Sequence, residues 1–120
     1  MKKNVALWVL QIAVAAMFVA AAVPKLAGAS MMVQEFDALG FGQWFRYFTA
    51  VLEIGGAVLL IVPVLAGIGG LVLAIVMVGA IVAHLLVLGG SALPAIVLLV
   101  ATLTIAWQRG AQRRSSLVRV

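Results

Sequence analysis

Two ionisable side chains, Glu53 and His84, lie inside long apolar runs and are the residues of this sequence best suited to chemistry. A carboxylate in hydrocarbon costs about 2.5 kcal/mol or more on insertion scales, so such a residue is a candidate functional residue by default. A carboxyl group in an apolar site is often neutral, and could then act as a general acid or donate a hydrogen bond to a ligand carbonyl. The structural alternative is that Glu53 pairs with Arg46 or Lys25 to hold the helices together, while His84 is an ordinary interhelical hydrogen-bond partner.

The composition places these residues in a membrane. The 120 residues are 67% hydrophobic and 9% charged, whereas a soluble domain is roughly one quarter charged. The net charge of +5 is carried largely by Lys2, Lys3 and the basic tail 109–120, a pattern typical of cytoplasmic flanks and not of a nucleic-acid-binding surface. The chain has no cysteine, which excludes disulfides, iron–sulfur clusters and thiolate zinc sites formed by this chain alone. We expect one integral membrane domain over residues 1–120, with no intrinsic cofactor.

Four apolar runs are long enough to cross a bilayer as helices, which takes about 20 residues each. They cover residues 5–23, 45–65, 68–88 and 93–108. A cleaved signal peptide is disfavoured for the first, because its run exceeds the usual apolar region of roughly 7–15 residues. An even number of spans puts both basic termini on one side, the cytoplasm by the positive-inside rule. The sequence predicts an all-α, four-transmembrane-helix bundle in a bacterial-type plasma (inner) membrane.

The segment between the first two spans predicts a short interfacial helix followed by an aromatic cluster. Ser30 fits an N-cap, and one helical stripe holds Met32, Val33, Phe36 and Leu39. Gly40 and Gly42 then break the helix. The residues that enter the second span include Phe41, Trp44, Phe45, Tyr47 and Phe48. This cluster is either an aromatic belt at the membrane interface or a gate over an apolar ligand.

Helix geometry places the rare polar groups at similar depth. At about 1.5 Å per residue, Glu53 lies roughly 12 Å and His84 roughly 6 Å below the outer ends of their spans. Lys25 and Arg46 lie at the same outer level, and Gln11 lies deeper in the first span. We therefore expect one convergent site in the outer half of the bilayer. Its candidate catalytic residues are Glu53 and His84, and its candidate ligand-binding residues are Lys25, Glu53, His84, Arg46, Gln11, Trp44, Phe41, Phe45 and Phe48.

Four segments, in chain order, resemble the DoxX-like family of small four-helix membrane proteins. They are residues 22–28 (AVPKLAG), 39–45 (LGFGQWF), 52–57 (LEIGGA) and 78–85 (VGAIVAHL). The resemblance covers roughly residues 5–110, with Lys25, Glu53 and His84 in place. It implies a four-helix membrane bundle, and partners among membrane oxidoreductase complexes or their assembly factors. It implies no particular reaction, because a fold does not specify a function.

These observations leave several functions open. The chain could be an accessory or binding subunit of a membrane redox system, with an outer-half site for a quinone or a lipid-like ligand. It could be a structural or assembly partner, or a homo-oligomer, whose Lys25, Glu53 and His84 only hold the bundle together. It could be a small intramembrane isomerase or cyclase with Glu53 as acid and His84 as base. A proton-coupled exporter is disfavoured, because such exporters carry a glutamate in the first span, where this chain has only Gln11.

Two structural signs separate these hypotheses. A ligand site predicts a cavity lined by Glu53, His84 and the aromatic residues of 41–48. A structural role predicts direct contact between Glu53 and Lys25, Arg46 or His84, without a cavity.

Overall fold

The computed structural model describes the backbone of residues 2–118 and the side chains of residues 4–113. Its elements, in chain order, are α1 (Lys2–Ala27), α2 (Ser30–Leu39), α3 (Trp44–Leu60), α4 (Ala66–Ala83), a π-helical turn η1 (His84–Leu88) and α5 (Leu93–Val118). Every regular element of the described chain is helical. The predicted all-α fold class is therefore confirmed for those residues.

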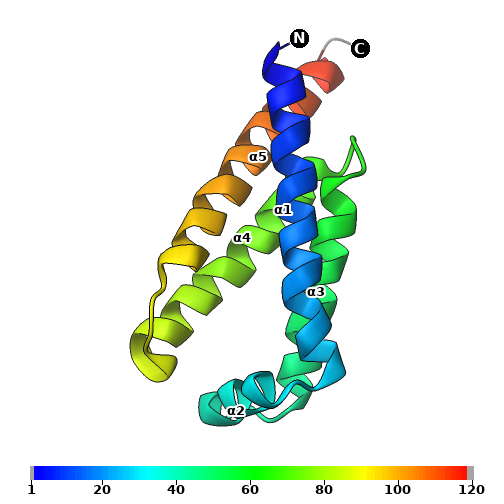
Figure 1. Ribbon diagram of the computed structural model, residues 1–120. Coiled ribbons are helices and arrows are strands. Elements are labelled where there is room, and N and C mark those ends of the chain that lie inside the picture. The colour runs from blue at the N-terminus through cyan, green and yellow to red at the C-terminus, as the bar shows by residue number, and fades with distance from the viewer. Residues whose placement is uncertain (1, 119–120) are drawn as a thin grey trace.

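The helices form two antiparallel pairs, α1 with α3 and α4 with α5, and α3 also packs against α4 (Figure 1). The start of α1, the end of α5 and the α3–α4 connection lie together at one end of the molecule, which we call the terminal end. The short helix α2 lies at the opposite end, which we call the α2 end. The two pairs diverge toward the α2 end, so the packing between them is closest near the terminal end.

Within the described part of the chain, three segments are long and apolar enough to cross a membrane: Asn4–Ala27, Ala66–Leu88 and Leu93–Arg113. The predicted span 45–65 is shorter than expected, because α3 has 17 residues and residues 61–65 form turns around Pro63. Proline lacks the N–H that would continue the helical hydrogen-bond ladder. The other apolar runs extend beyond their predicted limits at one or both ends.

Two predicted helix ends were wrong. Pro24 does not end the first helix, since α1 continues through it to Ala27. Membrane helices tolerate an internal proline where neighbouring groups satisfy the freed backbone, and the result is that Lys25 lies in the last helical turn. Ser30 is not the N-cap of α2 but its first helical residue, and the cap position is Ala29, which makes no side-chain capping bond.

The core lies where α1, α3, α4 and α5 meet. Phe18, Leu60, Leu73 and Ile105 are fully buried there. Gly70 allows the backbones of α4 and α5 to touch, because a Cβ atom at this position would lie 2.8 Å from the Thr102 carbonyl oxygen and 2.9 Å from the Ala106 nitrogen. This close contact fixes α4 and α5 as one rigid pair near the terminal end.

Candidate functional site

The Glu53 side chain is buried in contact with Lys25, close to the α2 end. Glu53 is 2% exposed, and the Lys25 ammonium nitrogen lies 3.0 Å from its Oε1 atom. Lys25 also donates a hydrogen bond of 3.2 Å to the Ala21 carbonyl. Although the Lys25–Glu53 distance is that of an ion pair, its direction is not that of a hydrogen bond, and Glu53 Oε1 has no hydrogen-bond partner among the described residues. The contact is therefore a buried charge pair, and the oxygen that contacts Lys25 accepts no hydrogen bond within the described residues.

Helical spacing explains why Glu53 faces inward. The buried face of α3 carries Arg46, Ala50, Glu53, Ala57 and Leu60, at intervals of three or four residues, which is the period of one helix face. The small side chains on either side of Glu53 let α1 approach this face. The extension of α1 past Pro24 then brings Lys25 to the carboxylate.

Arg46 joins three segments at the α2 end and does not pair with Glu53. Its guanidinium donates hydrogen bonds to the Lys25 carbonyl oxygen and, at 2.9 Å, to Gln43 Oε1. Gln43 in turn donates a hydrogen bond of 3.0 Å to the Val33 carbonyl in α2. The guanidinium also lies 4.3 Å from the ring centre of Tyr47. These bonds connect the end of α1, the helix α2 and the start of α3.

His84 lies at the start of η1, and its described hydrogen bond is local. Its Nδ1 atom is 2.9 Å from the Gly89 carbonyl oxygen, so that nitrogen carries the proton and donates. Neither the ion pair of Glu53 nor this hydrogen bond links the two predicted catalytic residues. Nothing in these contacts forms an acid–base pair. His84 begins a π-helical turn. Such turns are rare and often occur at functional sites, so His84 stays a candidate functional residue without Glu53 as its partner.

The predicted aromatic residues cluster around Phe45. Ring-centre distances from Phe45 are 5.4 Å to Phe41, 5.6 Å to Trp44 and 6.1 Å to Phe48. Phe36 of α2, which was not predicted as a site residue, is buried and lies 5.9 Å from Phe45. The cluster attaches α2 to the start of α3, while Phe41 and Trp44 stay exposed.

Gln11 does not lie with the other predicted site residues, but near the terminal end. It donates a hydrogen bond of 2.7 Å to the Leu60 carbonyl and accepts one of 2.6 Å from Arg109 Nε. Arg109 Nη1 donates to Asn4 Oδ1 and to Gln112 Oε1, both at 2.7 Å. We call Asn4, Gln11, Arg109 and Gln112 the Arg109 cluster. Sequence reasoning missed Arg109 because it assigned residues 109–120 to a basic tail; the lone Gln11 in the first span was the signal that a partner was needed.

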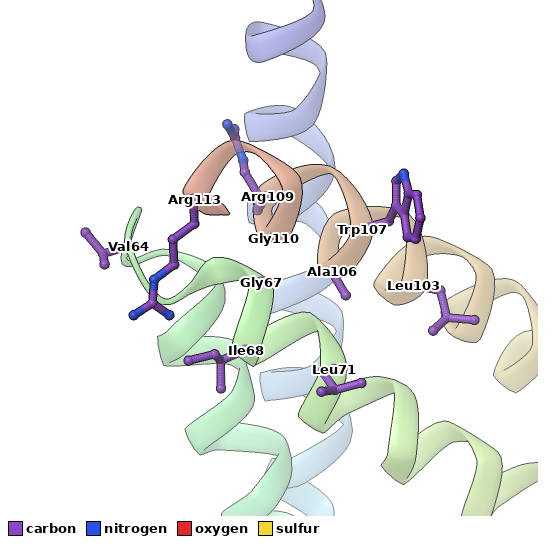
Figure 2. Close-up of a pocket in the computed structure, with 10 residues that line it drawn as sticks. All are labelled: Val64, Gly67, Ile68, Leu71, Leu103, Ala106, Trp107, Arg109, Gly110 and Arg113. Carbon is purple, nitrogen blue, oxygen red and sulfur yellow. The ribbon is translucent and has the colours of Figure 1, made fainter. Parts of the chain in front are cut away.

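A cavity of about 510 Å³ opens between α4 and α5 at the terminal end. Figure 2 shows its lining residues, which include Ile68 and Leu71 from α4 and Leu103, Trp107 and Arg113 from α5. None of the predicted site residues lines it. The predicted site and this cavity are thus separate features at different ends of the bundle.

Comparison with known proteins gives one match. Residues 9–107 match the family model described as the DoxX-like family. No curated protein and no solved structure matches the chain. The matched range contains Lys25, Glu53 and His84 and confirms the resemblance found in the sequence.

Proposed function

The chain belongs to the DoxX-like family, and from this premise we propose that it is a four-span membrane protein that serves as a non-catalytic helical subunit. In this proposal α3 is the remaining crossing helix, because 17 residues extend about 26 Å at 1.5 Å per residue, close to the bilayer core of about 30 Å. The terminal end faces the cytoplasm of a bacterial-type plasma membrane, because the basic residues of both chain ends gather there.

The observation that carries this proposal is the direct contact between Lys25 and Glu53. A charge buried alone in an apolar bundle is strongly unfavourable, and removal of one partner from a buried pair typically costs about 3–5 kcal/mol. The pair therefore fixes the end of α1 against the middle of α3. This contact is the sign that distinguishes a structural role from an open ligand cavity.

Exposed glycines support the role of a subunit that packs against a partner helix. Gly55 and Gly79 are exposed, and a Cβ atom at either would meet nothing within 4 Å. Glycine in a helix is less stable than alanine by roughly 0.5–1 kcal/mol, and the chain's own packing does not require glycine at these positions. Small residues on a lipid-facing surface allow another helix to approach closely. Membrane oxidoreductases are the partner class that the family resemblance implies, and a second copy of the chain is the alternative partner.

A second candidate function is supported by Glu53 Oε1, which lies beside the Lys25 ammonium but has no hydrogen-bond partner among the described residues. A reduced quinone, or a lipid with a hydroxyl group, could donate a hydrogen bond to Oε1, the atom that lacks a partner among the described residues. The aromatic cluster around Phe45 would then cover the ligand. This function requires the α2 end to open, because Glu53 is almost completely buried.

A double-mutant cycle separates the two functions. We would purify Lys25→Met, Glu53→Leu and the double variant in mild detergent, then measure thermal unfolding and co-purifying small molecules by native mass spectrometry. A structural pair predicts that each single variant unfolds at a lower temperature and that the double variant recovers most of the loss, since an apolar replacement of a whole buried pair is often neutral or stabilising. Asp37→Asn, at an exposed carboxylate on α2, is the control.

The outcomes are distinct. A double variant no more stable than the single variants overturns the structural role. A quinone or lipid that co-purifies with the wild type and is lost from a stable double variant supports the ligand site, whether or not the pair also stabilises the bundle.

A further inference from the structure

The terminal end has an excess of positive charge with no carboxylate side chain to balance it. The whole sequence contains three acidic residues, Glu35, Asp37 and Glu53. Glu53 pairs with Lys25, and the other two belong to α2 at the opposite end. Arg109 and Arg113 therefore have no acidic side chain of this chain as a partner.

Arg109 is an unusual member of this group because it is buried. It is 9% exposed, and its described hydrogen bonds go to the neutral side chains of the Arg109 cluster. Its Nη2 atom is buried and has no hydrogen-bond partner among the described residues. Buried charges are normally paired with an opposite charge. The Arg109 guanidinium lies 5.4 Å from the ring centre of Trp8 but has no acidic partner. Its charge, one helical turn before that of Arg113, makes this region favourable for an anion.

The cavity between α4 and α5 lies beside these cations and has an apolar wall. Its sides are formed by Ile68, Leu71 and Leu103, and Trp107, which is 70% exposed, lies at its edge. Its inner limit lies where α4 and α5 touch, since a Cβ atom on Gly67 would be 3.0 Å from the Gly110 nitrogen. In Figure 2 the Arg113 side chain extends across the cavity toward Ile68. Arg109 also lines the cavity, and its guanidinium donates a hydrogen bond to Gln11 of α1.

We propose that this cavity binds an anionic phospholipid, with its phosphate on Arg113 and one acyl chain along Ile68, Leu71 and Leu103. Arginine matches phosphate with two parallel hydrogen bonds, and basic pockets between membrane helices are suited to anionic head groups. Exposed tryptophan is typical of the head-group level, so Trp107 places Arg113, one to two turns further along α5, in the phosphate region. Arg109 also lines the cavity and adds to its positive potential, while its hydrogen bonds go to the Arg109 cluster.

A lipid fits these observations better than an acidic protein partner does. The cavity is a concave apolar slot on a helix surface that faces hydrocarbon, where acyl chains are the surrounding solvent. Its two charged lining residues, Arg109 and Arg113, lie at the head-group end. A phospholipid has its anionic phosphate at the membrane surface and its apolar chain below it, which matches the arginine side chains and the apolar wall of the cavity. The site is independent of the Lys25–Glu53 pair, so either proposal can fail without the other.

The test compares an anionic and a zwitterionic lipid with the same acyl chains. Delipidated protein would be titrated with phosphatidylglycerol and with phosphatidylcholine of identical acyl chains, and binding measured by native mass spectrometry. We expect one phosphatidylglycerol per chain, bound in preference to phosphatidylcholine. Arg113→Gln should lower that preference by about fivefold, the factor that corresponds to about 1 kcal/mol per basic residue near a membrane surface. Arg113→Lys, which keeps the charge at the same position, should retain most of the preference.

A second pair of variants tests the acyl-chain seat. Leu71→Trp fills the cavity and should abolish the preferential binding, whereas Val78→Trp, on an exposed part of α4 that does not line the cavity, should not. Because Arg113 is exposed, we expect Arg113→Gln to fold. This variant therefore tests the lipid site even if a tryptophan variant does not fold. Equal binding of the two lipids by the wild type, or an undiminished preference in Arg113→Gln, overturns the proposal.

Discussion

Gln11 and Arg109 are 98 residues apart in the sequence, yet the Arg109 guanidinium donates a hydrogen bond of 2.6 Å to the Gln11 side chain. The same amide donates to the Leu60 carbonyl at 2.7 Å. One fully buried side chain thus links α1, α3 and α5. The amide nitrogen donates to the Leu60 carbonyl and the amide oxygen accepts from Arg109. Loss of the amide therefore leaves both of these buried groups without that hydrogen bond.

Replacement of Gln11 by leucine should lower the free energy of unfolding. Each buried group left without a hydrogen bond costs about 1–3 kcal/mol, and more where the group is charged, as Arg109 is. Thermal unfolding in detergent, followed by circular dichroism, measures the effect. Gln34→Leu, at an exposed position of α2, is the matched control. Equal unfolding temperatures for the two variants would show that the buried amide contributes nothing.

Two glycines of α4 should respond to alanine in opposite ways. At Gly70 a Cβ atom would lie 2.8 Å from backbone on α5, so Gly70→Ala must separate the helices, and overpacking of this kind typically costs about 1–3 kcal/mol. At Gly79 a Cβ atom meets nothing, so Gly79→Ala should keep or raise stability by up to about 1 kcal/mol. Chemical unfolding of the two variants beside the wild type checks this, and a destabilised Gly79→Ala would contradict it.

Arg46→Lys should loosen the connection between α2 and α3. Lysine keeps the charge but lacks the planar guanidinium, which donates to the Lys25 carbonyl and to Gln43 Oε1 at the same time. We expect faster amide hydrogen exchange over residues 28–45 with little change in α4 and α5. Arg113→Lys, at the terminal end, should leave exchange in that segment unchanged. Unaltered exchange in Arg46→Lys would mean that the aromatic cluster alone holds α2 in place.

The proposed topology can be read by cysteine labelling, because the natural chain has no cysteine. Single variants Asp37→Cys, Val64→Cys and Gln112→Cys would be treated in whole cells with a membrane-impermeant maleimide. Four spans predict labelling at position 37 only. If α3 does not cross, positions 64 and 112 become labelled as well, which would reduce the protein to the three spans that length and hydropathy support directly.

Much of the fold could be predicted because it depends on local composition. The apolar runs and the turns that separate them follow from residue type, and Gly40 ends α2 in the left-handed conformation that glycine readily adopts. Lys25 and Arg46 were both considered as partners for Glu53, and the structure selects Lys25. Lys25 reaches Glu53 because α1 continues through Pro24. The rule that proline ends a helix predicts the opposite.

The cavity and the Arg109 cluster could not be predicted, because they arise from packing between distant helices. Arg109 lies at the end of the last apolar run, where a basic residue is expected to face water, and its burial becomes evident only once α5 is placed beside α1. The cavity depends on the contact between Gly67 and Gly110 and on the splay of the helices around it. Neither leaves a periodic signal in the sequence.

The Lys25–Glu53 contact has a consequence for how the protein is made. During synthesis α1 leaves the ribosome before α3, so Lys25 reaches the membrane while its carboxylate partner has not yet been translated. Until α3 is inserted, the ammonium group of Lys25 is expected to lie near the lipid head groups, where a long side chain can keep its charge in water. Lys25 can pair with Glu53 only after α3 has been inserted. We therefore expect α1 and α3 to reach their final packing together.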